Sequence, residues 1–170
     1  LSTTLAEAKS LINNSDNEKG GFFLYRVFRG LPKNKPLIKF LSEEGVKQIL
    51  QKTENFFMQD NNREMHQIDE ELYFTIDEKN NQIELTDKGI NTLSEDLDDK
   101  DFFIMPNIST QISSIESKGL SPEDEAKEKN DLFNDFNIKS ERIHSINQLL
   151  KAFTLFEKDV EYVVVENKVM

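Results

Sequence analysis

The chain has 170 residues, which is about one domain by length and enough to bury a core of its own. Its 32 acidic and 21 basic residues give a formal net charge of -11, which opposes binding to nucleic acid or to an anionic membrane surface. The lack of cysteine excludes disulfides, thiol catalysis and cysteine-bound metal, and it fits a cytoplasmic location. The sequence has no apolar run of the roughly 20 residues needed to span a bilayer.

Residues 1–71 are predicted to form a helical layer. The first helix has one apolar face and ends at Asn13-Asn14-Ser15. Gly20-Gly21 is expected to precede the second helix, which Gly30-Leu31-Pro32 closes. Apolar spacing predicts two further helices over residues 37–41 and 46–57.

This layer is rich in aromatic side chains, for which two interpretations stay open. They are Phe22, Phe23, Tyr25, Phe28, Phe40, Phe56 and Phe57. Packing in a core accounts for such rings, because aromatic side chains dominate interior burial. The alternative is a groove that accepts apolar segments of an unfolded polypeptide, in which case some rings stay exposed.

A β-hairpin followed by a helix is predicted for residues 72–97. Strands over residues 73–76 and 83–85 flank the polar run 77–82. Thr86 stands where a helix N-cap is expected, and apolar residues follow it at helical spacing.

Residues 98–138 are predicted to be a helical insert. The acidic run 96–101 lacks the central glycine and distal glutamate of a calcium-binding EF-hand loop, so we expect a solvated loop. A helix over residues 108–118 is expected to stop at Gly119. Ser121-Pro122 has the features of a helix start, with an N-cap serine and a proline at the first position.

Residues 139–170 are predicted to form a helix and a strand. Six apolar residues at spacings of three and four predict a helix over residues 142–156 with one stripe buried against a core: Ile143, Ile146, Leu149, Leu150, Phe153 and Phe156. A β-branched strand is expected over residues 160–165, followed by a turn over 166–168. The chain stops where a second strand is expected to begin, so we expect it to be part of a larger protein.

Two blocks of the sequence together resemble the preprotein cross-linking domain of the SecA family, ATPase motors that drive secretory proteins through a membrane channel. Residues 73–89 read YFTIDEKNNQIELTDKG and match a hairpin that ends in LT-[DE]-[KR]-G. Residues 144–165 read HSINQLLKAFTLFEKDVEYVVV and match a helix with an ALF-x-[RK]-DV-[DE]-Y ending. The remaining segments look like the longer version of this domain that one branch of the family carries.

The resemblance implies an α+β, mainly helical fold with a β-hairpin and a C-terminal linker strand, divided into residues 1–71, 72–97, 98–138 and 139–170. It also implies no catalytic, metal or nucleotide site here, with ATP and Mg²⁺ bound by motor domains elsewhere in the parent protein. In agreement, the six glycines include no G-x-x-x-x-G-K-[ST] loop to hold a nucleotide's phosphates.

The resemblance further implies where the domain touches its client. Tyr162 matches the tyrosine that lines the path of the translocating polypeptide, and Val163 and Val165 are weaker candidates because they neighbour it in the strand. The implied partners are preproteins, signal peptides, the SecYEG channel and the motor domains. A monomeric fragment is expected, in a cytoplasmic parent that associates peripherally with the inner membrane.

Two functions from other classes remain as alternatives. A free-standing acidic adaptor would dock one folded partner through the helical layer. A hydrolase with paired carboxylates would need a constellation of residues that the sequence does not show. His66 and His144, the two histidines, are far apart in sequence and are read as ordinary side chains.

Overall fold

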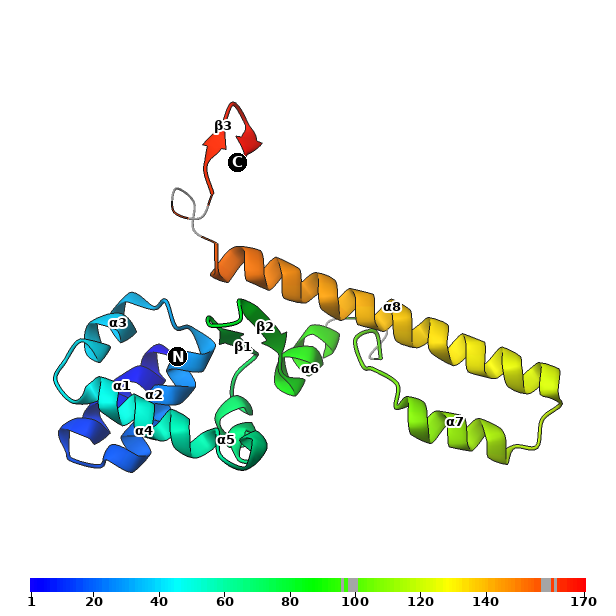
Figure 1. Cartoon of the computed structure of the whole chain (residues 1–170), viewed down its shortest axis with the longest axis horizontal. Coiled ribbons are helices and arrows are strands. Elements are labelled where there is room, and N and C mark those ends of the chain that lie inside the picture. Colours follow the sequence, from blue (N-terminus) through cyan, green and yellow to red (C-terminus); the bar gives the residue numbers. More distant parts are fainter. Residues whose placement is uncertain (96, 98–100, 157–159, 161) are drawn as a thin grey trace. The chain divides into compact units, whose positions relative to one another are not determined.

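The computed structural model describes residues 1–95, 97, 101–156, 160 and 162–170, apart from the side chain of Asp60. Contacts divide the chain into two compact units, Leu1–Gly89 with Leu150–Met170, and Ile90–Leu149. Figure 1 shows the order of the elements along the chain. Most of the acidic run 96–101, predicted to be a loop, lies outside the described residues.

The helical layer of the first unit is formed by α1 (Ser2–Asn13), α2 (Asn17–Gly30), α3 (Lys35–Leu41), α4 (Val46–Phe57) and the short α5 (Met65–Asp69). The four longer helices confirm the predicted ones. Their apolar faces meet in one core: Leu5, Ala8, Leu24, Tyr25, Val27, Leu37, Phe40, Val46, Leu50, Phe57, Met65 and Ile68. Burial of these faces, more than the propensity of such short helices, holds the layer together.

The prediction that Gly20-Gly21 precedes the second helix is wrong, since both glycines lie inside α2 and are buried. They allow neighbouring helices to approach closely. A Cβ atom on Gly20 would meet Ile12 Cγ1 of α1 at 2.5 Å, and one on Gly21 would collide with Thr53 Oγ1 of α4. Packing against two helices therefore outweighs the low helix propensity of glycine, which costs about 1 kcal/mol relative to alanine.

Gly21→Ala is expected to destabilise the domain by about 1–2 kcal/mol, although helix propensity alone favours alanine by about 1 kcal/mol. The added methyl group would clash with Thr53 Oγ1. Thr53→Ala removes that atom, so the double variant should recover most of the loss. Urea denaturation of the four proteins in this cycle measures the coupling. A stabilised Gly21→Ala variant would contradict the packing argument.

Two strands, β1 (Phe74–Asp77) and β2 (Gln82–Leu85), form the predicted antiparallel hairpin. Its inner face pairs Ile76 with Ile83, both buried, and these pack with Leu155 in a small second core. The next helix, α6 (Asp87–Glu95), begins as predicted at Thr86, whose Oγ1 accepts a hydrogen bond from the backbone N–H of Gly89 at 3.1 Å. The polar run is shorter than predicted because Asp77 and Gln82 pair with each other in the ladder.

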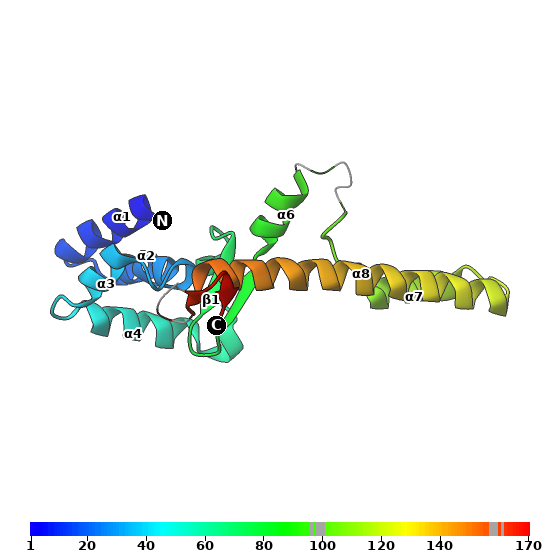
Figure 2. The same cartoon turned by 90° about the horizontal axis from the view of Figure 1, so that it is seen from above.

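The second unit contains α7 (Ile108–Ser117) and most of α8 (Pro122–Thr154). The predicted stop after the first of these helices and the predicted start of the second are both present. Gly119, after α7, has φ +61°, and Ser121 Oγ, before α8, accepts a hydrogen bond from the backbone N–H of Asp124 at 3.2 Å. Ion pairs join the two helices, with Lys118 Nζ 2.8 Å from Glu128 and Lys129 Nζ 2.8 Å from Glu116. Figure 2 shows the pair from above.

The helix predicted over residues 142–156 is not a separate element, since it is the C-terminal part of the 33-residue α8. No glycine or proline occurs between residues 123 and 154, so nothing in the sequence interrupts the backbone ladder that starts at Pro122. The division expected between residues 138 and 139 therefore falls inside one helix.

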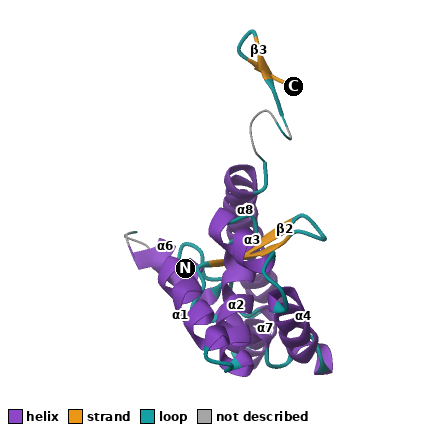
Figure 3. Ribbon diagram, turned by 90° about the vertical axis from the view of Figure 1, so that its left-hand side faces the viewer, coloured by secondary structure: helices purple, strands orange, loops and turns teal. Residues whose placement is uncertain are grey.

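Within the strand predicted over residues 160–165, Val164–Val165 form β3, and residue 161 lies outside the described residues. Strand β3 pairs with β4 (Lys168–Val169), so the second strand expected at the end of the chain does form. Lys168, predicted to lie in the turn, belongs to β4, and the turn is reduced to Glu166-Asn167. In the described part of the chain, strands occur in these two hairpins (Figure 3).

Candidate functional site

The C-terminal hairpin, residues 162–170, contains all three side chains predicted to contact a client. Val163 and Met170 exchange two backbone hydrogen bonds of 2.9 Å, and Val164 pairs with Val169. Both turn residues have left-handed backbone angles, φ +50° at Glu166 and +60° at Asn167. Such two-residue turns match the twist of antiparallel strands, which fixes the register of the hairpin.

This register places the predicted residues on opposite faces, because successive side chains of a strand alternate. Tyr162 shares a face with Val164 and, across the ladder, with Val169. Val163 and Val165 point to the other face. The exposed Val164 and Val169, which sequence reasoning did not single out, are therefore the apolar neighbours of Tyr162, a signal that strand alternation could have given.

Each strand of this hairpin has one strand neighbour among the described residues. The outer edges of β3 and β4 therefore keep backbone groups that another extended segment can pair with. Tyr162 is half-buried, whereas every residue from Val163 to Met170 is exposed. The site is thus an apolar ribbon with accessible strand edges.

The apolar stripe predicted for the C-terminal part of α8 is not buried as a whole. Leu150 packs beside Leu155, but Leu149 and Phe156 are exposed and Phe153 is 86% exposed. The small core around Ile76 and Ile83 covers the side of the helix end that carries Leu150. The side that carries Phe153 stays exposed. The prediction of a fully buried stripe is therefore wrong, and the exposed side chains leave an apolar surface on the last turns of the helix.

A second apolar feature lies in the helical layer, where an open groove of ≈ 1010 Å³ runs between α2 and α4. Phe22, Phe23, Phe56 and Phe57 line it, together with Ile49. Their rings pack edge-to-face, with Phe56 and Phe57 centroids 5.2 Å apart and Phe22 and Phe23 centroids 5.5 Å apart. The aromatic group divides by burial: Tyr25, Phe40 and Phe57 belong to the core, whereas Phe56 is exposed.

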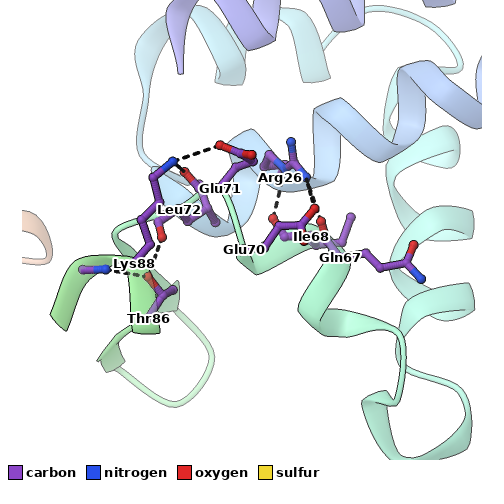
Figure 4. A network of polar contacts seen from close by, with 9 residues as sticks. Arg26, Gln67, Ile68, Glu70, Glu71, Leu72, Thr86 and Lys88 are labelled. Carbon is purple, nitrogen blue, oxygen red and sulfur yellow. Dashed lines mark hydrogen bonds and ion pairs between the residues drawn. The ribbon is translucent and has the colours of Figure 1, made fainter. Parts of the chain in front are cut away.

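Arg26 of α2, next to the groove, contacts the backbone at the end of α5 (Figure 4). Its guanidinium lies 4.8 Å from the ring centroid of Phe22, and it donates hydrogen bonds of 3.0 and 2.7 Å to the carbonyl oxygens of Ile68 and Gln67. The cation–π contact and the fixed fork of donors hold α2 against the end of α5.

Beside it, Arg29 makes a two-pronged ion pair with Asp69, with Nε–Oδ1 and Nη2–Oδ2 distances of 2.6 and 2.7 Å. Burial opposes the charge of the guanidinium, but the hydrogen bonds and the opposite charge of Asp69 outweigh it, so the pKa of Arg29 is raised. Burial also opposes the charged form of the neighbouring Tyr25 hydroxyl and so raises its pKa. The Arg29 guanidinium therefore stays charged and the Tyr25 hydroxyl stays neutral at neutral pH, and the ion pair acts as a structural clamp.

The hairpin of β1 and β2 is fastened by a third polar contact. Lys88 Nζ lies 2.9 Å from Glu71, and their hydrogen bond lowers the pKa of Glu71 and raises that of Lys88. Thr86 Oγ1 donates a hydrogen bond to the carbonyl oxygen of Leu72 (Figure 4). Both contacts join the segment before β1 to the start of α6.

The remaining candidate groups do not converge. His66 lies in α5, with its Nδ1 atom 3.0 Å from the carbonyl oxygen of Arg63. His144 is exposed on α8. In the described part of the chain, no three histidine, aspartate or glutamate side chains are arranged to hold a metal ion. Within the same residues, no helix has the length and apolar character needed to cross a membrane.

Comparison with known proteins supplies the context for these features. The family model for the SecA preprotein cross-linking domain matches residues 51–170. A Protein translocase subunit SecA from Christiangramia forsetii is 63% identical over 99% of this chain, and those from Flavobacterium psychrophilum and Parabacteroides distasonis are 60% and 53% identical over 98% and 99%. No solved structure shows significant similarity.

The chain spans about 15% of the length of each of these relatives. The match to the family model covers both sequence blocks that carry the resemblance, and the identity to the relatives extends through the helical layer as well. The chain therefore belongs to the family of SecA preprotein cross-linking domains.

Proposed function

We propose that this domain is the substrate-binding clamp of a SecA translocation motor and contacts preproteins through its C-terminal hairpin. The observation that carries the proposal is the exposed apolar ribbon around Tyr162 and Val164, with strand edges that other residues in the described part of the chain leave unpaired. A motor that moves many sequences needs contacts that do not depend on side-chain identity. Backbone pairing at a strand edge has this property.

The proposal assigns the chemistry to other parts of the parent protein. Motor domains outside this chain bind ATP and Mg²⁺, and their hydrolysis cycle biases the clamp between open and closed states. This domain moves as a jaw about its strand connections and delivers preproteins, including their signal peptides, toward the SecYEG channel. The parent works in the cytoplasm at the inner membrane, and the domain itself has no catalytic role.

A photo-cross-linking experiment in the full-length translocase tests this proposal. A photoreactive phenylalanine analogue replaces Tyr162, and a matched variant carries it in place of Ile138, an exposed residue of α8 in the other unit. A preprotein stalled during translocation should cross-link at position 162 and much less at position 138. Equal yields at both positions, or none at position 162, would contradict the proposal.

The acidic adaptor remains a second candidate because the helical layer offers its own groove. It predicts that cross-links to one folded protein arise from α2 and α4 and that position 162 gives none. The same experiment, extended to a photoreactive group at Phe56, therefore separates the two functions.

A further inference from the structure

We propose that the aromatic groove between α2 and α4 is a second client-binding site, which takes uncharged apolar segments of the unfolded polypeptide. The inference rests on the proposed function for the class of ligand, a preprotein, but on different residues from the C-terminal hairpin. The two sites can therefore fail separately.

The rings at the groove are arranged as a binding surface as well as a core. Phe57 is 6% exposed and packs against Phe22 and Tyr25, with centroid distances of 5.8 and 6.2 Å. Its neighbour Phe56 is 61% exposed, although its ring packs edge-to-face on Phe57. An aromatic ring held in place yet open to solvent can add contact area on binding while losing little rotamer freedom.

The walls of the groove are fixed by contacts on both sides. Close packing at Gly21 sets the distance between α2 and α4, and Arg26 holds Phe22 beneath its guanidinium while it binds the backbone of Gln67 and Ile68. Thr53 Oγ1 is occupied by a hydrogen bond to the carbonyl oxygen of Ile49 at 3.0 Å. The groove is therefore formed before any ligand arrives, which lowers the cost of binding.

The charged residues at the rim of the groove favour a ligand without strong charge. Three carboxylates and two ammonium groups line the groove, and they belong to Asp16, Glu18, Glu64, Lys19 and Lys52. Two of the carboxylates are engaged locally: Asp16 accepts from the backbone N–H of Lys19, and Glu64 accepts from Gln67. With both signs present, the rim has no strong field to attract an acidic or a basic ligand, so apolar contact dominates recognition.

The size of the groove fits a stretch of polypeptide. Its volume of ≈ 1010 Å³ matches the upper end of the roughly 300–1,000 Å³ typical of small-molecule sites, and the groove is open to solvent. Several bulky side chains of an extended or helical segment fill such a space. An unfolded preprotein supplies such segments, since its core side chains are not yet buried.

The groove includes residues on both sides of the point where the family match begins. The family model begins at residue 51, so all of α2 and the start of α4 lie outside its match, whereas the match to the relative from Christiangramia forsetii covers 99% of the chain. The lining of the groove therefore comes from both sides of the point where the family match begins, with Phe22 and Phe23 before it and Phe56 and Phe57 after it.

Fluorescence anisotropy of a labelled peptide with this domain tests the inference. The probe is an apolar peptide whose one lysine and one glutamate, at its ends, give it no net charge, and a polar peptide of equal length serves as the control ligand. Phe56→Glu should weaken binding of the apolar probe about tenfold, since it replaces an exposed ring by a charge, a loss of about 1.4 kcal/mol. Phe133→Glu, at an exposed phenylalanine of α8 in the other unit, is the matched control and should leave affinity unchanged.

The hairpin variant Tyr162→Asp separates this inference from the proposed function. Groove binding that survives Tyr162→Asp and is lost in Phe56→Glu supports a second site. Equal affinity of the Phe56→Glu and Phe133→Glu variants would overturn it, as would the absence of saturable binding in a cooperatively melting domain. Binding of a folded partner at the groove with no binding of the peptide would also overturn it, in favour of an adaptor surface.

Discussion

Replacing Arg29 with methionine is expected to lower the free energy of unfolding by about 2–3 kcal/mol. The change leaves the carboxylate of Asp69, which is 23% exposed, without the two hydrogen bonds it now accepts at 2.6 and 2.7 Å. Breaking a buried ion pair by removing one partner costs about 3–5 kcal/mol, and partial exposure to water reduces that figure here. Chemical denaturation followed by circular dichroism measures the loss.

Two further variants show whether the loss comes from the stranded carboxylate. Arg29→Met combined with Asp69→Leu removes both charges and should recover most of the stability. Lys118→Met breaks an ion pair with Glu128 that is exposed on both sides, so it should cost less than about 1 kcal/mol. Equal losses for the Arg29 and Lys118 variants would contradict the assignment of Arg29 as a clamp between α2 and α5.

Tyr162→Asp is expected to weaken client binding at the C-terminal hairpin at least about tenfold while the melting temperature of the domain stays unchanged. A charge on the face shared by Tyr162, Val164 and Val169 opposes apolar contact, which is worth roughly 1.5–3 kcal/mol for a fully buried large side chain. Stability should hold because the hairpin lies outside both cores. Isothermal titration calorimetry with an unfolded secretory-type peptide measures the change.

The register supplies a matched control for this variant. Val165→Asp introduces the same charge on the opposite face of the same strand, at a residue that is also exposed. A stronger effect at position 162 than at 165 identifies the client-facing side. Loss of cooperative melting in Tyr162→Asp would instead assign this tyrosine to the packing of the domain.

Local signals in the sequence predicted many of the elements correctly. Thr86, Gly119 and Ser121 each mark a helix end through hydrogen bonds or backbone angles of a few neighbouring residues, so the structure confirms them. The pairing of Ile76 with Ile83 likewise follows from alternation over a short hairpin. Such features depend on chemistry within a few residues and can be read without the fold.

Features that depend on distant partners could not be read in this way. Gly20-Gly21 resembles a break between elements, and its position within α2 is explained by Ile12 and Thr53 on two other helices. The stripe that includes Phe153 has helical spacing, but spacing gives the face and not what covers it, and 86% of Phe153 is exposed. The sequence also does not predict that Phe56 is exposed and Phe57 buried, because the two adjacent residues have the same apolar side chain.

The candidate site was predicted in part. The family resemblance pointed to Tyr162, and its role stays a prediction until a client is tested. Strand adjacency then suggested Val163 and Val165, whereas the register groups Tyr162 with Val164 and Val169. The difference arises because side chains alternate along a strand, so the nearest neighbours in sequence lie on opposite faces.

The central claim, that the C-terminal hairpin contacts the client, is tested most directly by an NMR titration of the labelled domain with an unfolded secretory-type peptide. A scrambled acidic peptide is the control. The account predicts saturable chemical-shift changes at Tyr162, Val164 and Val169 with the first peptide and none there with the second. A well-dispersed spectrum in which these residues stay unshifted by both peptides would contradict it.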